Sequence, residues 1–451
     1  MTNPSTISHV DLDASYLHPL TDPNDRGRLT VLVRGEGVFV EDAEGRRYID
    51  GLAGLWNVNL GHGRAELAEA AADQMRRLAF ASTYSGFANV PALELAERLR
   101  RLAYPGLRAS FLAPSGVDAN EAAFKTARYY WRRQGKPAKV KILSLEWGYH
   151  GATIAGMSAT GMPDYARMFQ PRLAEFVHVR SPYPYRCDFA RPGEGVGAAA
   201  ARLLDETIRR EGPATVAALI AEPVQGAGGV IVPPDDYFPR VRQVLDEHEV
   251  LLVADEIITG FGRTGEWFGL THWDVRPDIV TFAKGVTSAY LPLGGMMVTD
   301  PIARAIKDAP ASERWMHSST YAGHPVCCAV ALKTLEILEE EKLVERAGRL
   351  GHYLLDRLRG LADLPAVGEV RGLGLMAAVE LVADRGTRTP FDPARRVGAE
   401  VCGRAQEAGL LLRSRGDVLT LAPPFVITEG QIDRLVAVLR AAIAEATEAA
   451  R

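Results

Sequence analysis

The chain has 451 residues, of which 47% are hydrophobic and 24% charged, and its formal net charge is −4 at pH 7. This composition is typical of globular proteins and excludes a strongly basic surface built for nucleic acid. No run approaches the roughly 18 apolar residues of a membrane span, and the polar segment 1–20 lacks the layout of a signal peptide. We therefore expect a cytoplasmic protein without a nucleic-acid or membrane partner.

The cysteine and histidine patterns argue against disulfides and against a metal site. The four cysteines, at positions 187, 327, 328 and 402, form no CxxC pair, and adjacent cysteines make poor disulfide partners. The ten histidines are scattered and form no HExxH motif. Reduced thiols and no bound metal are therefore expected.

Residues 113–133, APSGVDANEAAFKTARYYWRR, predict a helix. Small residues and one tyrosine recur along one helical face, at positions 119, 122, 123, 126, 127 and 130. Ser115 and Gly116 stand at its start, where free N–H groups and the helix dipole suit an anion such as phosphate. An ordinary N-cap is the commoner reason for such residues, so this pattern alone does not identify a site.

Four short apolar runs predict buried strands, at residues 140–146, 216–224, 250–256 and 278–284. Helical stretches such as residues 235–249 separate them. Buried strands that alternate with helices predict an α/β domain with a mostly parallel sheet. In such sheets ligands bind beyond the carboxyl ends of the strands.

Three ionisable residues fall at those carboxyl ends, namely Glu222, Asp255 and Lys284. A strand-end aspartate that caps a loop would explain Asp255 alone, since a buried acid needs a partner. Three such residues on one edge of a sheet indicate a site. Gly285 follows the lysine directly, and we expect it to leave the backbone room beside a bulky ligand.

The loop 146–161 presents Trp147, Tyr149 and His150 among glycines. Such aromatic residues either anchor the core or stack on a flat ring. Residues 260–265 match a GxGxxG pattern, but the sequence after them has no helical period. A dinucleotide fingerprint needs that helix, so we reject the dinucleotide interpretation.

The chain from about residue 330 onward predicts a smaller α+β domain. We expect one long helix over 328–358, short strands within 369–381 and 409–424, and a closing helix over 430–450. The first 60 residues are expected to join this part. The predicted large domain is therefore 61–325, and the predicted small domain combines 1–60 with 326–451.

One ligand would use all of these features. Pyridoxal 5′-phosphate offers an aldehyde to a lysine, a pyridine nitrogen to an acid, a phosphate to a helix start and a flat ring to aromatic side chains. A carboxylate beside that nitrogen keeps it protonated, which makes the ring an electron sink. Each feature is weak by itself, and together they predict this cofactor.

Three segments carry a family resemblance, LLVADEIITGFGRTG (251–265), TFAKGVTSAYLPLGG (281–295) and HSSTYAGHPVCCAVAL (317–332). With them the chain resembles the class III (subgroup II) aminotransferases, which are pyridoxal-phosphate-dependent transferases of fold type I. The resemblance extends from residues 48–63 to residues 416–428. It implies a homodimer with shared active sites, or a tetramer.

The resemblance implies a role for each site residue. Lys284 would bond covalently to the cofactor and then move a proton between the substrate Cα and the cofactor C4′. Asp255 would pair with the pyridine nitrogen, supported by Glu222, while Ile257 and Tyr149 would sandwich the ring. The remaining cofactor-binding residues that it implies are Ser115, Gly116, Val117, His150 and Thr320.

The phosphate site departs from the family pattern at positions 117 and 118, and the change at 117 is the one that matters for phosphate binding. The family usually reads Ser-Gly-Ser-Glu-Ala where residues 115–119 read Ser-Gly-Val-Asp-Ala. Val117 offers only its backbone N–H, so one hydroxyl contact to phosphate is lost, which affects the affinity for the cofactor rather than its identity. Thr320 would reach the phosphate of the neighbouring subunit.

Trp56 and Arg413 resemble the substrate residues of the amine:pyruvate, or ω-transaminase, branch. Arg413 matches a movable arginine that holds a keto-acid carboxylate, to which a guanidinium fork is well suited. The alternatives are a core tryptophan and a surface arginine no different from Arg415. The other substrate residues implied are Tyr149 and, from the partner chain, Tyr84 and Phe87.

The implied function is transfer of an amino group from a primary amine or ω-amino acid to a keto acid. Pyruvate would be the acceptor, in a ping-pong mechanism through pyridoxamine phosphate. The nearer alternative is a 2-oxoglutarate-dependent aminotransferase for 4-aminobutyrate or ornithine-like substrates. A mutase or decarboxylase on the same scaffold, and an inactive binding protein, are further alternatives; the intact Lys284 and Asp255 argue against the last.

Overall fold

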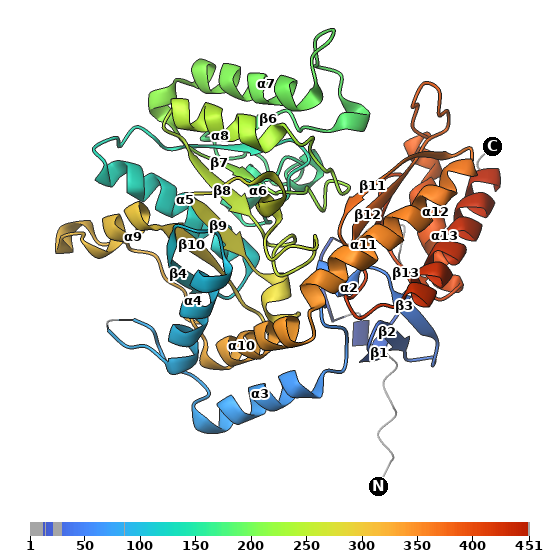
Figure 1. Ribbon diagram of the computed structural model, residues 1–451, viewed down its shortest axis with the longest axis horizontal. Coiled ribbons are helices and arrows are strands. Elements are labelled where there is room, and N and C mark those ends of the chain that lie inside the picture. The colour runs from blue at the N-terminus through green and yellow to red at the C-terminus, as the bar shows by residue number, and fades with distance from the viewer. Residues whose placement is uncertain (1–11, 14, 21–28, 85, 450–451) are drawn as a thin grey trace.

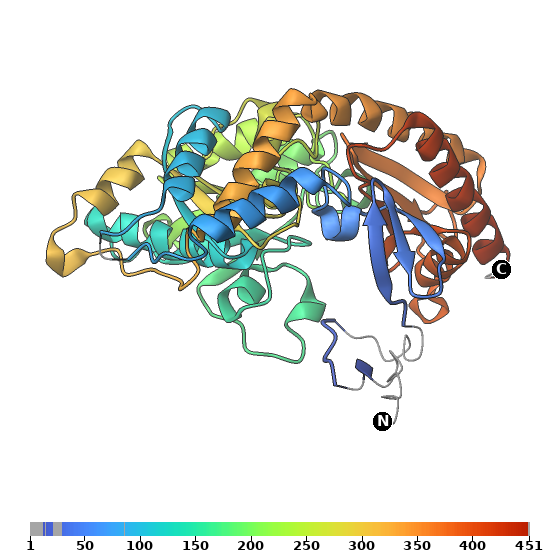
Figure 2. The ribbon, with the colours of Figure 1, turned by 90° about the horizontal axis from the view of Figure 1, so that it is seen from below.

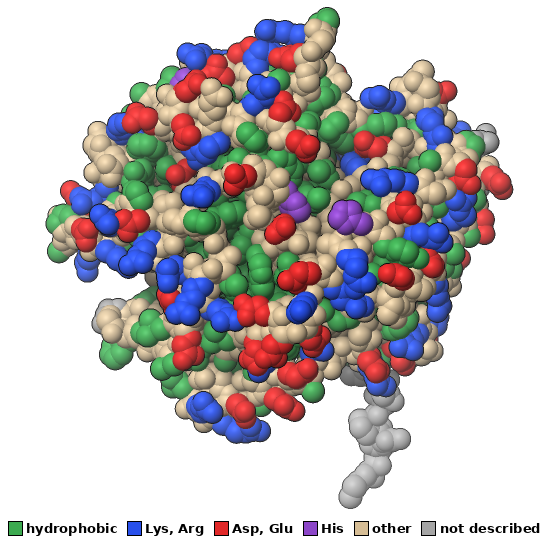
Figure 3. Space-filling model, in the orientation of Figure 1, with side chains coloured by type: hydrophobic (Ala, Val, Ile, Leu, Met, Phe, Trp, Pro, Cys, Tyr) green, Lys and Arg blue, Asp and Glu red, His purple; other side chains and the backbone are tan. Residues whose placement is uncertain are grey.

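The computed structural model describes residues 12–13, 15–20, 29–84 and 86–449. The first eleven residues lie outside the described residues. They belong to the predicted small domain and to the segment 1–20, in which we expect no signal peptide. Residue 450, the last of the predicted closing helix, also lies outside the described residues. Acidic and basic side chains are interspersed over the face seen in Figure 3. None of the helices in the described ranges combines the length and apolarity that a membrane crossing requires.

A seven-stranded, mostly parallel sheet forms the centre of the molecule, as predicted (Figure 1). Its strands β5 to β9 pair in parallel, whereas β10 is antiparallel to both of its neighbours. The apolar runs of β7 and β8 are buried at every position, which is why they belong in the middle of the sheet. The order is β4 (Leu107–Ala113), β10 (Gly294–Thr299), β9 (Ile279–Phe282), β8 (Leu251–Asp255), β7 (Val216–Ala221), β5 (Lys141–Leu145) and β6 (Phe176–Val179).

Helices cover both faces of this sheet (Figure 1). Alternate residues of each strand point to opposite faces, so the sheet has two separate apolar cores. One face packs against α5 (Gly116–Arg133), α6 (Ile154–Ala159) and α9 (Asp300–Lys307). The other packs against α4 (Val90–Leu102), α7 (Val196–Glu211), α8 (Tyr237–Glu247) and α10 (Pro325–Glu340), and α3 (Ala65–Arg77) lies along α10.

The C-terminal part forms a second, antiparallel sheet covered by helices on one face, consistent with the expected α+β arrangement (Figure 2). Its strands are β11 (Val367–Leu373), β12 (Met376–Leu381), β15 (Val418–Leu421) and β14 (Arg413–Arg415), in that spatial order. The helices are α11 (Leu343–Arg359), α12 (Val397–Glu407) and α13 (Glu429–Ala449).

The N-terminal segment pairs with the C-terminal part through a third sheet (Figure 2). The short strand β13 (Leu410–Leu411) pairs in parallel with β3 (Arg47–Asp50). β1 (Leu32–Glu36) and β2 (Phe39–Asp42) complete this sheet as antiparallel neighbours. After β3, the short helix α2 (Ala53–Trp56) leads toward the large sheet.

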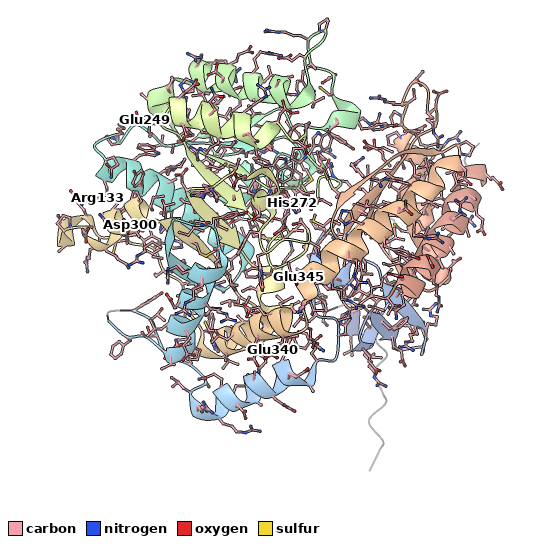
Figure 4. The ribbon with its side chains drawn as sticks, in the orientation of Figure 1. Arg133, Glu249, His272, Asp300, Glu340 and Glu345 are labelled. Atoms are coloured by element: carbon pink, nitrogen blue, oxygen red, sulfur yellow. The ribbon has the colours of Figure 1, made fainter. Side chains whose placement is uncertain are left out.

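The single long helix expected over 328–358 is wrong, because the chain forms α10 and α11 with a break between them. Lys342 has a left-handed backbone with φ of 51°, which ends one helix and starts the next. Glu340 lies at the end of α10, and Glu345 lies in the first turn of α11 (Figure 4). An acidic side chain interacts favourably with the helix dipole only at an N-terminus, so Glu345 suits a helix that begins here, whereas Glu340 gains nothing from the dipole at the end of α10.

Candidate active site

The three predicted strand-end residues come together because their strands are neighbours in the sheet. β7, β8 and β9 are adjacent and parallel, so their carboxyl ends meet at one edge. Glu222 follows β7, Asp255 ends β8, and Lys284 comes two residues after β9. This edge is the ligand-binding edge expected of an open parallel sheet.

Asp255 is a buried carboxylate whose oxygens are occupied by three donors. Its Oδ2 accepts hydrogen bonds from Nδ1 of His150 at 2.7 Å and from Nδ2 of Asn120 at 2.9 Å. Its Oδ1 accepts the N–H of Ile257 at 3.2 Å. The side chain is 2% exposed, and these donors satisfy its buried oxygens and fix its orientation.

Lys284 has a side-chain amine that is partly neutral near physiological pH and can therefore act as a nucleophile. Its backbone is left-handed, with φ of 44°, a conformation that is costly for a residue with a Cβ and that recurs at functional sites. Burial lowers the pKa of its amine to about 8, although the carboxylates of Asp255 and Glu222 oppose that shift and Arg413 adds to it. Among the described residues, its amine has no hydrogen-bond partner. A neutral amine is therefore accessible near physiological pH.

The space beside Gly285 is filled by protein, which corrects the expectation that this glycine makes room for a ligand. A Cβ at position 285 would lie 2.5 Å from Nδ2 of Asn59. The amide of Asn59 is fixed in turn, because its Oδ1 accepts a hydrogen bond from Arg263 at 2.6 Å. The glycine accommodates a side chain of the N-terminal segment.

Glu222 supports the loop that follows β5 rather than contacting Asp255 directly. Its Oε1 accepts the N–H of Tyr149 and its Oε2 accepts the N–H of Gly226, each at 2.9 Å. Burial raises the pKa of Glu222 to about 7. The charge of His150 opposes that shift, whereas the charge of Asp255 adds to it. Its effect on Asp255 is thus electrostatic and positional.

The start of α5 has the features of an anion site. The N–H groups of Gly116 and Val117 lie in the first turn, where no intrahelical acceptor exists. Ser115 is the N-cap, and its Oγ accepts from the N–H of Asp118 and donates to that side chain at 2.6 Å. Gly116 lies against Ile257, since a Cβ there would be 2.9 Å from Cδ1 of that residue.

Val117 turns its side chain toward a pair of glycines in the next loop. A Cβ at Gly151 would lie 2.3 Å from Cγ2 of Val117, and a Cβ at Gly156 would lie 3.0 Å from the same atom. The departure from the family pattern at position 117 is therefore accommodated by packing. The backbone N–H remains at the start of the helix.

Two residues predicted to flank a ring lie near the Asp255 carboxylate. Tyr149 and Ile257 are half-buried, and both are tied to site carboxylates through their backbone N–H groups. The ring of Tyr149 also packs against Tyr165, with the two ring centroids 5.1 Å apart. Burial raises the pKa of Tyr149.

The residues predicted to bind substrate are placed differently from one another. Trp56 is 5% exposed and has a left-handed φ of 64°, so it is part of the core within a single chain. Arg413 is exposed, and its charge acts on both Lys284 and Tyr149. The residues that lie exposed on the surface of the single chain are Tyr84, Phe87 and Thr320.

Asn120 is a residue of the candidate site that sequence reasoning missed. Its Nδ2 bridges the carboxylate of Asp255 and the backbone carbonyl of His150, at 2.9 and 3.0 Å. The signal was present, because Asn120 is a polar residue on a helix whose neighbouring face is small and apolar, and it is completely buried. Without the fold, nothing indicated which strand end it faces.

The site fits pyridoxal 5′-phosphate on the chemistry of its donors. It has a reactive amine, a buried and hydrogen-bonded carboxylate, and a helix start with free N–H groups. Nε2 of His150 is buried with no partner among the described residues, as expected where a further group completes the site.

Comparisons with known proteins agree with this chemistry. The family model Aminotransferase class-III matches residues 21–443. A putrescine–pyruvate aminotransferase of Pseudomonas aeruginosa is 41% identical over 429 residues, which cover 94% of this chain and 93% of that protein.

Solved structures give the same result. An (S)-enantioselective ω-transaminase from Thermomicrobium roseum is 48% identical with a TM-score of 0.93, covering 97% of this chain and 98% of that one. The ω-transaminase of Pseudomonas jessenii, in complex with PMP, is 39% identical with a TM-score of 0.94 and covers 98% of each chain. Fold, site and sequence agree, and the chain belongs to the class-III aminotransferases, which use pyridoxal 5′-phosphate as their cofactor.

Proposed function

We propose that this aminotransferase moves an amino group from a primary amine or ω-amino acid to pyruvate. The observation that carries the proposal is the geometry of the strand ends, where the amine of Lys284 and the buried carboxylate of Asp255 lie at the ends of two adjacent parallel strands. The charge of Arg413, which favours a carboxylate ligand, acts on the same region. The similarity to a putrescine–pyruvate aminotransferase and to ω-transaminases supports the same donor and acceptor classes.

The cofactor would be held by residues of three elements. The N–H groups of Gly116 and Val117 would bind its phosphate, with Ser115 as the cap of that helix. Tyr149 and Ile257 would bound the two faces of its ring. Thr320, exposed in the single chain, would bind the phosphate in the neighbouring subunit.

Asp255 would hold a proton at the ring nitrogen. When bound, the cofactor supplies a protonated ring that withdraws electrons from the substrate Cα. The carboxylate of Asp255 can keep that proton in place because His150 and Asn120 fix its orientation and its charge. Glu222 would hold the loop that carries Tyr149 in place beside this carboxylate, because it accepts the N–H of Tyr149.

Lys284 would move the substrate proton. Its amine, with a pKa of about 8, is a base suited to neutral or mildly alkaline pH. It would take the proton from the substrate Cα and deliver it to the cofactor C4′.

Arg413 would select the acceptor. Among the residues that the structure describes, its guanidinium has no ion-pair partner, so it is free to bind the carboxylate of a keto acid. Trp56 would restrict the substrate pocket from the N-terminal segment, where its ring is already buried.

We further propose a homodimer with shared active sites. Tyr84 and Phe87 are 43% and 71% exposed in the single chain, and Thr83 ties their loop to the Thr320 loop by a hydrogen bond to the carbonyl of Ala322 at 3.2 Å. Exposed aromatic residues of this kind favour an interface. Light scattering of the purified protein should give twice the chain mass, and Phe87→Asp should lower it.

The remaining proposals concern domains and compartment. We propose a large domain of residues 61–325 and a small domain of residues 1–60 and 326–451, supported by the pairing of β3 with β13. A cytoplasmic location is supported by the four cysteines, which are all free thiols.

The experiment that tests the function is a two-substrate assay. The enzyme loaded with pyridoxal 5′-phosphate is given putrescine or another primary amine together with pyruvate or 2-oxoglutarate, and amino acid formation is measured. We expect alanine to form from pyruvate. Activity with 2-oxoglutarate alone would refute pyruvate as the acceptor.

Lys284→Ala tests the chemistry in the same assay. Loss of the proton-transferring amine should reduce the rate at least about 1,000-fold, within the range for general acid–base catalysis. The control is Lys307→Ala, an exposed lysine on α9. Full turnover of Lys284→Ala would refute the mechanism.

A further inference from the structure

Arg415 points to the same side of the small sheet as Arg413. β14 is an extended strand, so residues 413 and 415 share one face, and their Cα atoms are roughly 6.5 Å apart. Ser414 points the other way, toward Gly398 of α12. The shared face is turned to the large domain. Arg371 of β11 lies in the same cross-strand row as Arg413, and it donates to the carbonyl of Gly229 at 2.7 Å.

The guanidinium of Arg415 lies over the ring of Trp147, 4.5 Å from its centroid. Trp147 belongs to the loop that supplies Tyr149 and His150 to the cofactor site. The tryptophan backbone is held in place, since its φ is 66° and a Cβ at Gly228 would lie 2.4 Å from its carbonyl oxygen. Arg415 therefore lies at the edge of the candidate active site, against an aromatic ring whose backbone is closely packed.

The charge of Arg415 is not neutralised by the protein. No carboxylate within residues 12–13, 15–20, 29–84 and 86–449 lies at ion-pair distance from it. Glu380, in the same row of the sheet, is already paired with Arg371 at 2.7 Å, and Asp164 is paired with Arg167. Arg415 is half-buried, and this burial lowers the pKa of its guanidinium. A half-buried cation without a counter-ion gains most when a bound anion supplies one.

We propose that Arg415 is a specificity residue that binds the distal carboxylate of a five-carbon 2-oxo dicarboxylate. Arg413 would hold the carboxylate next to the keto group, and Arg415, two residues further along the same face of β14, would meet the other carboxylate. The inference rests on the proposed transaminase function and extends its acceptor range beyond pyruvate.

The chemistry of the exchange is the same for both acceptors. The donor gives up its amino group and the Cα hydrogen and becomes a carbonyl compound. Water supplies the oxygen of that carbonyl. The 2-oxo acid takes up the amino group and a hydrogen at its C2 and releases its keto oxygen as water, so no external oxidant or reductant is consumed. Arg415 changes only which acceptor binds.

The test compares acceptors in Arg415→Leu and the wild-type enzyme. We measure kcat/KM for 2-oxoglutarate and for pyruvate with one primary amine donor, and take their ratio. Losing one charge-assisted bond should lower that ratio about tenfold or more, through KM rather than kcat. Arg415→Lys should recover part of it, because it keeps the charge without the fork.

Arg47→Leu is the matched control. Its guanidinium also stacks on an aromatic ring, 3.9 Å from the centroid of Phe39, but Arg47 is the exposed first residue of β3. This variant should leave the ratio unchanged. A second measurement is inhibition by glutarate relative to butyrate, which have two carboxylates and one; Arg415→Leu should weaken only the preference for glutarate.

The outcomes separate the two proposals. An unchanged acceptor ratio and an unchanged glutarate preference in Arg415→Leu would overturn the role of Arg415 and leave the transaminase function intact. An equal loss of kcat/KM for both acceptors and of affinity for both inhibitors would also overturn the role of Arg415, since a merely structural residue would give that result. A wild-type enzyme that aminates no keto acid would refute the proposed function itself.

Discussion

The imidazole of His150 donates its Nδ1–H to Oδ2 of Asp255 across 2.7 Å, and both side chains are almost completely buried. A carboxylate only accepts, so the proton lies on Nδ1 of the imidazole. The same oxygen accepts from Asn120, which leaves the carboxylate with a single orientation. Because the carboxylate cannot turn, its direction at the strand end is set before any ligand binds.

Replacing the imidazole should weaken the enzyme without unfolding it. His150→Phe removes one hydrogen bond to a buried charge, worth about 1.5–3 kcal/mol, so we expect kcat/KM to fall about 10- to 100-fold. His150→Asn, which keeps an N–H donor, should recover part of the loss. His352→Phe, at an exposed position on α11, is the control and should have no effect. Equal activity of His150→Phe and wild type would contradict this role.

The pKa of Lys284 predicts how the apoenzyme takes up its cofactor. Only the neutral amine attacks the aldehyde, and burial lowers its pKa from 10.5 to about 8. The uptake rate, followed by visible absorbance, should therefore rise about tenfold per pH unit below pH 8 and level off above it. Asp255→Asn should move this midpoint to lower pH, because it removes a charge that favours the ammonium.

The same shift predicts the pH dependence of stability. Between about pH 8 and 10.5 the unfolded chain binds the Lys284 proton and the folded chain does not, so the free energy of unfolding of the apoenzyme should rise across that window. Denaturant titrations at several pH values would measure it. Lys284→Met should abolish the rise attributable to this residue, and a variant with the wild-type profile would refute the assignment.

Arg263 should be among the most sensitive positions for stability. It is completely buried, and it donates to Oδ1 of Asn59, to the carbonyl of Pro423 at 2.7 Å and to that of Leu375 at 3.3 Å. Arg263→Met would leave these buried acceptors without donors and should lower the free energy of unfolding by about 3 kcal/mol or more. Arg359→Met, at an exposed position on α11, should change it by less than about 0.5 kcal/mol.

Val117→Ser tests the departure in the phosphate site. A hydroxyl at this position would add one hydrogen bond to a charged group, so the Kd of the cofactor should fall about tenfold in titrations of the apoenzyme. The variant should also lose stability, since the valine side chain packs against Gly151 and Gly156. Val117→Ala loses the same packing without gaining a hydroxyl. If both variants changed the Kd equally, the hydroxyl would not be the cause.

Much of the fold could be predicted because the central strands are apolar throughout and separated by amphipathic helices. The runs at 216–224 and 250–256 became β7 and β8, which are buried at every position. The break between α10 and α11 could not be predicted, because every residue around Lys342 favours a helix and only its left-handed backbone ends one.

The candidate site was predictable where chemistry depends on strand ends. The strand-end rule identified Glu222, Asp255 and Lys284, which the structure brings to one edge of the sheet. Asn59 could not be identified, because it acts on Gly285 from a distant part of the chain. The difference between Arg413 and Arg415 also needed the fold, since it depends on which of them faces Trp147.

The contact between Asn59 and Gly285 has a practical consequence for engineering. The turn that carries Lys284 is bounded by an amide that Arg263 holds, and Arg263 is itself bonded to carbonyls of the C-terminal part. Substitutions at these distant positions should alter the reactivity of the lysine without touching any substrate. Mutant libraries confined to residues that line the substrate pocket would therefore miss substitutions at Asn59 and Arg263, through which the pH dependence of the enzyme could be adjusted.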